Sequence, residues 1–418
     1  RFAAELQKAH LDEMKEFLVE LGVKAPICGT NITFTLGDLW ASTNMDYTND
    51  HAYWDHTSTL GKFRTYNNKS VVLSPPWHSG TLSSFARAKL VGKPTVASEW
   101  NYVYPNHHRC EGLPYTAAYS AYQDWDAPMF YCATGSFNSG RWEGLHENPG
   151  ILVHTQQTDP ATWGLSQICA LLYRRRDVAI GRRRLVIRYG PEQIWQNRSV
   201  LGRLKFLPAV ARIETELVKG DIDAWPMALP PEGQTEEEAY LEALRQLGDT
   251  SSSLSRVVSD TGELRRDVAE GVFLVDTPRT QIACGKINRL VDAADTLSSL
   301  AVNSPIPFGT VALSSLDGRA LVESSRMLLV AVGNARNADA VIEDYVIKNM
   351  GRKGPVMAEP VEGSLTVRRT NGDALRGFAL DTLTGERKEE LQVSTLADGV
   401  TFTLQRAHGT IYYELTAE

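Results

Sequence analysis

The chain has few cysteines, and their spacing argues against two classes of structure. Five occur among 418 residues, widely spread and with no CxxC pair. Cysteines in this arrangement predict neither a zinc site nor a disulfide framework. Three of them lie in apolar stretches, PICGT, FYCAT and QICALL, where a free cysteine behaves as a small buried hydrophobe.

The sequence also lacks a long apolar run and a strong excess of one charge. No stretch approaches the length that spans a bilayer, so we expect no membrane partner. There are 43 basic and 50 acidic residues, a formal net charge of −7, which gives no reason to expect nucleic acid. The one arginine-rich run, between Arg174 and Arg184, surrounds apolar residues and is typical of a helix end and a turn.

Two hydrolase signatures are missing as well. We find no G-x-S-x-G elbow and no credible cysteine nucleophile, which argues against a serine or cysteine hydrolase. What remains is an ordinary globular composition, 43% hydrophobic and 22% charged, in a chain long enough for two or three domains.

The stretch Lys93 to Tyr104, KPTVASEWNYVY, is the most informative in the chain. An apolar run that begins after Pro94 ends at Glu99 and continues into aromatic and amide side chains. This pattern predicts a buried strand that delivers one carboxylate at its end, where parallel α/β folds place their chemistry. The alternative is that Glu99 caps a solvated loop.

The first 185 residues alternate between helical and strand-like patterns. Residues 2–21 carry apolar side chains at helical spacing and stop at Gly22, a good C-cap. The alternation predicts half of an eight-stranded β/α barrel. We expect strands around residues 23–31, 50–56, 93–104 and 123–131, and further helices around residues 81–90, 116–122 and 162–174.

The polar groups at these strand ends carry a family resemblance. Thr30-Asn31, His51-x-Tyr53-Trp54, Ser98-Glu99-Trp100-Asn101 and Gln123-Asp124-Trp125-Asp126, in this order, resemble the second half of a clan A retaining glycoside hydrolase. The resemblance covers about residues 1–185. It implies that Glu99 is the catalytic nucleophile, that His51 and Tyr53 line the sugar site, and that Trp125 is a sugar platform. The other substrate-binding candidates that it implies are Asn31, Trp54, Trp100, Asn101 and Asp126.

One part of the family pattern is absent. Enzymes of this clan supply their acid/base glutamate from an Asn-Glu pair on the fourth barrel strand, and this chain has no such strand. Retaining hydrolysis needs two carboxyl groups about 5 to 5.5 Å apart, so one carboxylate cannot perform both steps. The possible proton donors within the chain are Glu143 and Glu147, after the fourth strand, and Asp124 or Asp126 beside Trp125.

Aromatic side chains are dense between residues 40 and 142, interleaved with Asn, Asp and His. Aromatic faces beside hydrogen-bonding groups suit sugars, whereas the alternative is a large aromatic core. Asn49-Asp50-His51 and His107-His108 could suggest metal ligands, but histidines on aromatic loops are more often hydrogen-bonded. We therefore expect no metal and no cofactor.

Beyond residue 185 the pattern changes twice. Residues 186–253 predict a helical linker region, with helices at 201–218 and at 235–247, the second starting with the capping box Thr235 and Glu238. Residues 254–418 predict an antiparallel β-sandwich, with hairpin signals at Asp317-Gly318, Asn371-Gly372 and Asp398-Gly399. The expected strands lie near residues 272–275, 281–287, 310–314, 327–332, 365–367, 400–404 and 411–415.

Two functions fit these observations. The first is a glycosidase acting on a β-linked sugar with Glu99 as nucleophile. The second is a catalytically silent carbohydrate-binding or scaffold protein derived from such an enzyme. A half-barrel exposes unpaired strand edges, so we expect a second copy of the chain, in a homodimer, to cover it. The alternative is that the C-terminal domain folds over the opening.

Overall fold

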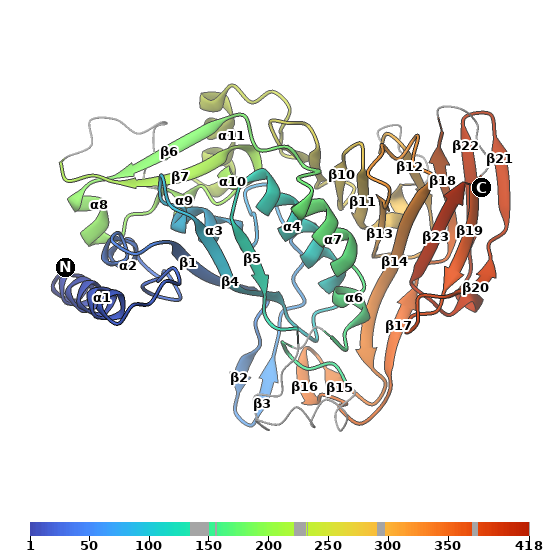
Figure 1. Ribbon diagram of the computed structural model, residues 1–418, viewed down its shortest axis with the longest axis horizontal. Coiled ribbons are helices and arrows are strands. Elements are labelled where there is room, and N and C mark those ends of the chain that lie inside the picture. The colour runs from blue at the N-terminus through green and yellow to red at the C-terminus, as the bar shows by residue number, and fades with distance from the viewer. Residues whose placement is uncertain are drawn as a thin grey trace.

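The computed structural model describes residues 1–133, 150–154, 157–220, 231, 233–290, 297–369 and 375–417. It shows an N-terminal lobe of helices and short parallel sheets beside a C-terminal lobe of antiparallel strands (Figure 1). Two hairpins, one from each lobe, project together from the junction (Figure 1). The described residues form several separate sheets and no closed barrel.

The N-terminal lobe is built around three parallel strands. They lie in the order β1 (Thr48–Trp54), β4 (Thr95–Tyr102) and β5 (Ala127–Phe130). The register pairs His51 of β1 with Glu99 of β4, so the carboxyl halves of both strands meet at one edge of the sheet. The predicted strands around residues 50–56, 93–104 and 123–131 are therefore confirmed.

The predicted strand at residues 23–31 is wrong. This segment makes a single bridge, between Cys28 and Tyr47, and is otherwise irregular. It is held instead by Asp46, whose carboxylate accepts from the Ile27 N–H at 2.8 Å and whose own N–H donates to the Ile27 carbonyl at 2.9 Å. Three strands rather than four form the sheet, so the half-barrel architecture stays a prediction.

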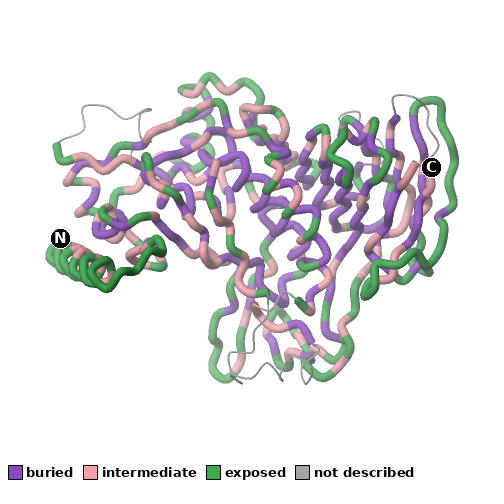
Figure 2. The backbone as a smooth tube through the Cα atoms, viewed as in Figure 1, coloured by how far each residue is buried: buried purple, intermediate pink, exposed green. Residues whose placement is uncertain are grey.

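Helices surround this sheet, and one of them is left largely uncovered. Residues 2–20 form α1 as predicted, but it has no buried residue, and Phe2 and Leu21 are 78% and 65% exposed. Figure 2 shows this helix as mostly exposed along its length. The other helices of the lobe are α2 (Leu36–Ala41), α3 (Leu82–Ala88), η1 (Arg109–Glu111), α4 (Gly112–Tyr122), α6 (Pro160–Trp163) and α7 (Ser166–Arg174).

The region 186–253, predicted as a helical linker, contains a second parallel sheet. Strand β6 (Arg184–Tyr189) pairs with β7 (Arg212–Leu217). The expected helix at 201–218 is wrong, because its last third alternates as a strand and Thr215 bridges to Leu90, just before β4. The helices found are α8 (Pro191–Gln196), α9 (Val200–Arg203), α10 (Leu207–Val210) and α11 (Glu236–Leu247), the last with its predicted capping box.

The C-terminal lobe consists of a large and a small antiparallel sheet. The large sheet has the order β20-β19-β23-β14-β13-β11-β10-β9-β8, with β17 beside β14, and the small one β12-β18-β22-β21. All seven expected strands are present. The bounds are β8 (Arg256–Val258), β9 (Leu264–Asp267), β10 (Val272–Asp276), β11 (Thr280–Gly285), β12 (Leu300–Asn303), β13 (Gly309–Ser315), β14 (Arg326–Asn337), β17 (Val356–Pro360), β18 (Gly363–Arg368), β19 (Leu375–Leu380), β20 (Arg387–Glu390), β21 (Val393–Leu396), β22 (Gly399–Leu404) and β23 (Tyr412–Ala417).

The large sheet separates two apolar cores. One face contributes Leu313 and Leu329 to a cluster with Phe402 and Val367 of the small sheet. The other face meets the N-terminal lobe, where the ring of Phe273 lies 5.1 Å from that of Tyr115 and 5.8 Å from that of Tyr119, both on α4. The two lobes are therefore packed through a continuous apolar interface.

A buried arginine of the C-terminal lobe fastens this interface. Arg266, on β9, is 1% exposed and donates to four backbone carbonyls of the N-terminal loop before α3. The donor–acceptor distances are 2.6 Å to Val71, 3.1 Å to Pro75 and to Pro76, and 2.7 Å to His78. Since Val71 and Pro76 are buried, the guanidinium satisfies carbonyl groups that packing alone would leave unpaired.

We expect Arg266→Met to lower the free energy of unfolding by about 3 kcal/mol or more, because four backbone acceptors, two of them buried, lose their donor while the aliphatic stem is kept. Urea titration followed by circular dichroism measures the change. The matched control is Arg289→Met, at an exposed arginine of the same lobe, which should stay close to the wild type. Equal stabilities for the two variants would contradict this account.

Candidate functional site

The carboxyl ends of β1 and β4 open into a cavity of about 680 Å³. Its walls come from both lobes. The N-terminal lobe contributes the ends of its parallel strands, the segment 152–154 and the hairpin of β2 (Ser58–Leu60) and β3 (Phe63–Thr65), and the C-terminal lobe contributes residues near the hairpin of β15 (Val341–Glu343) and β16 (Val346–Asn349). The lining residues are Tyr53, His56, Lys62, Phe63, Arg64, Glu99, Tyr131, Cys132, Leu152, Val153, His154, Ile347, Lys348, Asn349, Met350 and Arg352.

Glu99 lies in the floor of this cavity with one carboxylate oxygen fixed. The Tyr53 hydroxyl donates to Glu99 Oε2 at 2.5 Å, and His51 Nδ1 lies 3.5 Å from the same oxygen. Among the described residues nothing donates a hydrogen bond to Oε1. The Glu99 side chain is 30% exposed, so an oriented carboxylate oxygen faces the cavity.

The neighbours of Glu99 are held in neutral forms. Burial, and then the hydrogen bond to Glu99, raise the pKa of the Tyr53 phenol, so it acts as a donor to the carboxylate. Burial lowers the pKa of His51, and the opposing charge of Glu99 only partly offsets this. Because His51 Nε2 also lies 2.8 Å from Ser98 Oγ, the ring is fixed between two polar groups of β4.

Aromatic rings surround Tyr53 at the cavity. The ring centroids of His154 and His56 lie 5.2 Å and 5.3 Å from that of Tyr53, and Tyr131 lies 6.3 Å away, all near edge-to-face. His56 Nε2 and His154 Nε2 are 3.2 Å apart, so one of them donates to the other. Burial, followed by the charges of His56 and Arg64, lowers the pKa of His154 to about 4, which leaves its imidazole neutral at neutral pH.

Asn337, at the end of β14, joins the walls from the two lobes. Its carboxamide donates to the Ile151 carbonyl at 3.0 Å and to the Met350 carbonyl at 2.6 Å, and accepts from the Ile151 N–H at 2.6 Å. Ile151 precedes the lining segment 152–154, and Met350 itself lines the cavity. One buried side chain therefore sets the distance between two walls that are almost 200 residues apart in sequence.

The β2–β3 and β15–β16 hairpins close the cavity from the outside. Strand β16 pairs with β3 in a four-stranded sheet of order β15-β16-β3-β2, with Ile347 opposite Arg64. This antiparallel sheet contains strands of both lobes and lies at the bottom of the view in Figure 1. Residues of the C-terminal lobe thus form one wall of the cavity at the carboxyl ends of the parallel strands, whereas the cover expected for a half-barrel stays a prediction.

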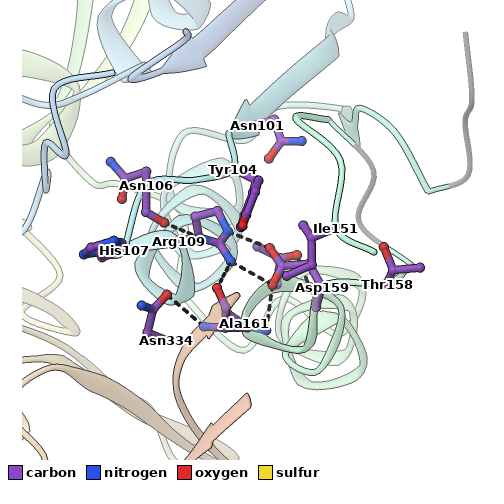
Figure 3. A network of polar contacts seen from close by, with 12 residues as sticks. Asn101, Tyr104, Asn106, His107, Arg109, Ile151, Thr158, Asp159, Ala161 and Asn334 are labelled. Carbon is purple, nitrogen blue, oxygen red and sulfur yellow. Dashed lines mark hydrogen bonds and ion pairs between the residues drawn. The ribbon is translucent and has the colours of Figure 1, made fainter. Parts of the chain in front are cut away.

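A second polar cluster lies just beyond β4. Arg109, in η1, binds both carboxylate oxygens of Asp159, at 2.6 Å and 3.1 Å, and donates to the Ala335 carbonyl at 2.7 Å. Its guanidinium also lies 4.9 Å from the ring centroid of Tyr104. Figure 3 shows Arg109 between Tyr104 and Asp159 at the centre of this cluster. The cluster is buried and serves to hold the chain after β4 against β14.

The structure brings together three of the residues singled out from the sequence, Glu99, Tyr53 and His51. Asn101 supports them indirectly, since its carboxamide donates to the carbonyls of Tyr131 at 2.7 Å and His154 at 3.1 Å, both in the cavity wall. Trp54 is half-buried outside the cavity, and its indole N–H donates to the Lys69 carbonyl at 3.1 Å.

The remaining candidates lie elsewhere, and their expected contact with substrate is corrected. Trp100 and Trp125 are buried in the core, where they pack edge-on against Phe130 and Phe85. Trp100 packs on a neighbouring strand, since Phe130 ends β5, and Trp125 packs on α3 through Phe85, so both rings belong to the core. Asn31 is exposed on a loop, and its carbonyl accepts from Asn49.

Asp126 is at the wrong end of the sheet. It precedes β5 rather than following it, and its carboxylate accepts from the Thr95 N–H at 2.8 Å, at the first residue of β4. Asp124 is beside it and lies 3.6 Å from Arg176. Neither can be the proton donor to a sugar bound at Glu99. Glu143 and Glu147, the other candidate donors, lie outside the described residues.

Sequence reasoning missed several lining residues. His56 ends the strand expected around residues 50–56, and the polar character of that segment is the only sequence pattern that points to it. His154, Tyr131 and the β16 residues gave none, because a local pattern does not show which distant segments converge. Within the described ranges, no three His, Cys, Asp or Glu side chains gather as a metal-binding group.

Comparison with protein-family models, with curated proteins and with solved structures finds no match. In the part of the chain that the structure describes, no helix is both long and apolar enough to cross a bilayer.

We expect Asn337→Ala to lower the free energy of unfolding by about 2 to 4 kcal/mol, because the Ile151 N–H and two buried carbonyls lose their partner. Hydrogen exchange should speed up at the Ile151 amide, which mass spectrometry of the segment around it can follow. Asn44→Ala, at an exposed asparagine, is the control. Unchanged exchange at Ile151 would show that Asn337 does not hold the wall.

Proposed function

We propose that this chain is a glycoside hydrolase that acts on a β-linked sugar by a retaining mechanism, with Glu99 as the nucleophile. The observation that carries the proposal is the state of the Glu99 carboxylate. One oxygen is fixed by Tyr53, the other faces an aromatic-lined cavity, and the strand that bears it ends at the cavity floor. A nucleophile must be presented in this way to attack an anomeric carbon in line.

The neighbours of Glu99 suit this role. Tyr53 as a neutral phenol donates one hydrogen bond, which orients the carboxylate without adding a charge that would lower its nucleophilicity further. The rings of Tyr131, His56 and His154 give the cavity apolar faces beside hydrogen-bonding edges. Such walls match a sugar, whose C–H faces stack while its hydroxyls bind polar groups.

The fold supports the resemblance to clan A in part. Strands β1, β4 and β5 run parallel, and Glu99, Tyr53 and His51 lie together at their carboxyl halves. Half of a β/α barrel remains the architecture that we propose for this lobe. The proton donor also remains a hypothesis, with Glu143 and Glu147 as the candidates, and it must supply the second carboxyl group of the mechanism.

We expect Glu99→Gln to reduce turnover of aryl β-glycosides by about 10³-fold or more, since the neutral amide cannot attack the anomeric carbon. Aryl glycosides are the right probe because an activated leaving group needs little protonation. Release of the phenol is measured by absorbance across several sugars, with circular dichroism as the check of folding.

The matched control is Glu343→Gln, an exposed glutamate of β15 that does not line the cavity, and it should retain the wild-type rate. Turnover by Glu99→Gln at the wild-type rate would exclude Glu99 as the nucleophile.

A catalytically silent carbohydrate-binding protein is the second candidate function. The observation that favours it is that Glu99 is the only carboxylate among the described residues lining the cavity. The same assay separates the two functions. Binding of sugars without turnover of any aryl glycoside supports the second, whereas turnover that depends on Glu99 supports the first.

Self-association is the partner prediction that we retain. The lobes already cover the cavity, so a second copy is not needed there, but α1 leaves Phe2, Leu6, Phe17, Val19 and Leu21 more than half exposed. Burying such apolar side chains against a second copy would stabilise a dimer.

We expect sedimentation velocity at micromolar concentration to show a dimer that Phe17→Ser with Leu21→Ser converts to monomer. Leu241→Ser, at an exposed leucine of α11, is the control and should leave the sedimentation coefficient unchanged. Monomer alone in the wild type would end this prediction.

A further inference from the structure

We propose that the sugar bound in this cavity carries a negatively charged substituent, a carboxylate or a sulfate ester, which four cations at the rim bind. This inference rests on the proposed function and names the substrate class. It starts from the charge of the cavity. Lys62, Arg64, Lys348 and Arg352 line it, against a single acid, Glu99, among the described lining residues.

This concentration of positive charge contrasts with the rest of the chain. The protein as a whole has a formal net charge of −7, so a random patch of its surface is expected to be slightly acidic. The four cations come from two segments, residues 62–64 and 348–352, that are almost 300 residues apart in sequence. Pairing of β3 with β16 brings them to one rim.

The four cations also lack ion pairs with the residues that the structure describes. Several other arginines of the chain do have a carboxylate partner, as Arg109 has Asp159 at 2.6 Å and Arg175 has Asp177 at 2.5 Å. None of the rim cations forms an ion pair with another described residue. The one hydrogen bond that Arg64 makes with its guanidinium is a long one, 3.4 Å to the Thr57 hydroxyl. Their charges are therefore available to a ligand.

Phe63 sets the position of the two lysines. The ammonium of Lys348 lies 4.2 Å from the centroid of the Phe63 ring, and that of Lys62 lies 5.1 Å from it. Contacts of this kind hold an ammonium near a ring face while leaving its N–H groups free for an anion. The two strands thus present lysines from both lobes over the same aromatic side chain.

The positive charge of the rim cations acts on the part of the cavity wall that lies beside Glu99. Arg64 is among the groups that lower the pKa of His154, and the His154 ring lies 5.2 Å from that of Tyr53, which binds Glu99. A substrate anion held at the rim would therefore be attracted there and kept apart from the Glu99 carboxylate, which would repel it. An acidic substituent and a carboxylate nucleophile repel each other, so the proposal places the substituent against the rim cations.

The test is a binding measurement in the inactive Glu99→Gln protein, which cannot consume the ligand. Isothermal titration calorimetry compares methyl β-D-glucuronide, methyl β-D-glucoside and methyl β-D-glucoside 6-sulfate. We expect at least one charged ligand to bind about tenfold more tightly than the neutral glucoside, and the preference to shrink as salt is raised. Which of the two charged ligands binds more tightly distinguishes a carboxylate substituent from a sulfate.

The rim is then tested in the same background. Arg64→Gln with Lys348→Gln should reduce the preference for the charged ligand by about tenfold. The control pair is Lys24→Gln with Arg319→Gln, two exposed cations away from the cavity, which should keep the preference. Both pairs are surface changes, and circular dichroism checks that they fold.

The outcomes separate this inference from the proposed function. Equal binding of all three ligands, or a preference that survives the rim substitutions, overturns the anionic substrate while turnover of neutral aryl glycosides keeps the hydrolase. If no ligand binds and no aryl glycoside is turned over by the wild type, both fail.

Discussion

The buried ion pair between Arg109 and Asp159 is the constraint on which the cavity depends. Two charges removed from water are stable only when their remaining hydrogen bonds are satisfied, and here the guanidinium also binds the carbonyl of Ala335. This fixes three segments against one another, namely the chain after β4, the start of α6 and the end of β14 (Figure 3). Glu99 lies upstream of the first, and the β15–β16 hairpin follows the last.

The site is consequently a product of the junction between lobes. The Glu99 carboxylate belongs to a parallel strand of the N-terminal lobe, whereas part of the rim, Lys348 and Arg352, belongs to the C-terminal lobe. Asn337 adds a second link, because its carboxamide binds the backbone of both walls. The apolar contact of α4 with the large sheet supplies buried area between the lobes. These polar groups fix how the two lobes are aligned.

The sequence predicted the floor of the cavity better than its walls. Glu99 and Tyr53 could be found because an apolar run ending in a polar group has a local signature. Asp126 and Trp125 were misplaced because the same signature does not tell whether polar residues precede or follow a strand, and these precede β5. Residues 23–31 were expected as a strand because of their apolar pattern, but Pro26 and the hydrogen bonds to Asp46 hold this segment in an irregular conformation. The β16 wall had no signal, since pairing with β3 spans almost 300 residues.

The antiparallel sheet of β15, β16, β3 and β2 allows the charge of the cavity rim to change during evolution. Its strands are short, and Lys62, Arg64 and Lys348 are exposed side chains, of which Arg64 makes only a long hydrogen bond to Thr57 within the described residues. Replacing these cations changes the charge of the cavity. It leaves Tyr53, Glu99 and the backbone hydrogen bonds around those two residues in place. The charge of the rim and the geometry around Glu99 are thereby placed on separate parts of the chain, so substitutions can change one without the other.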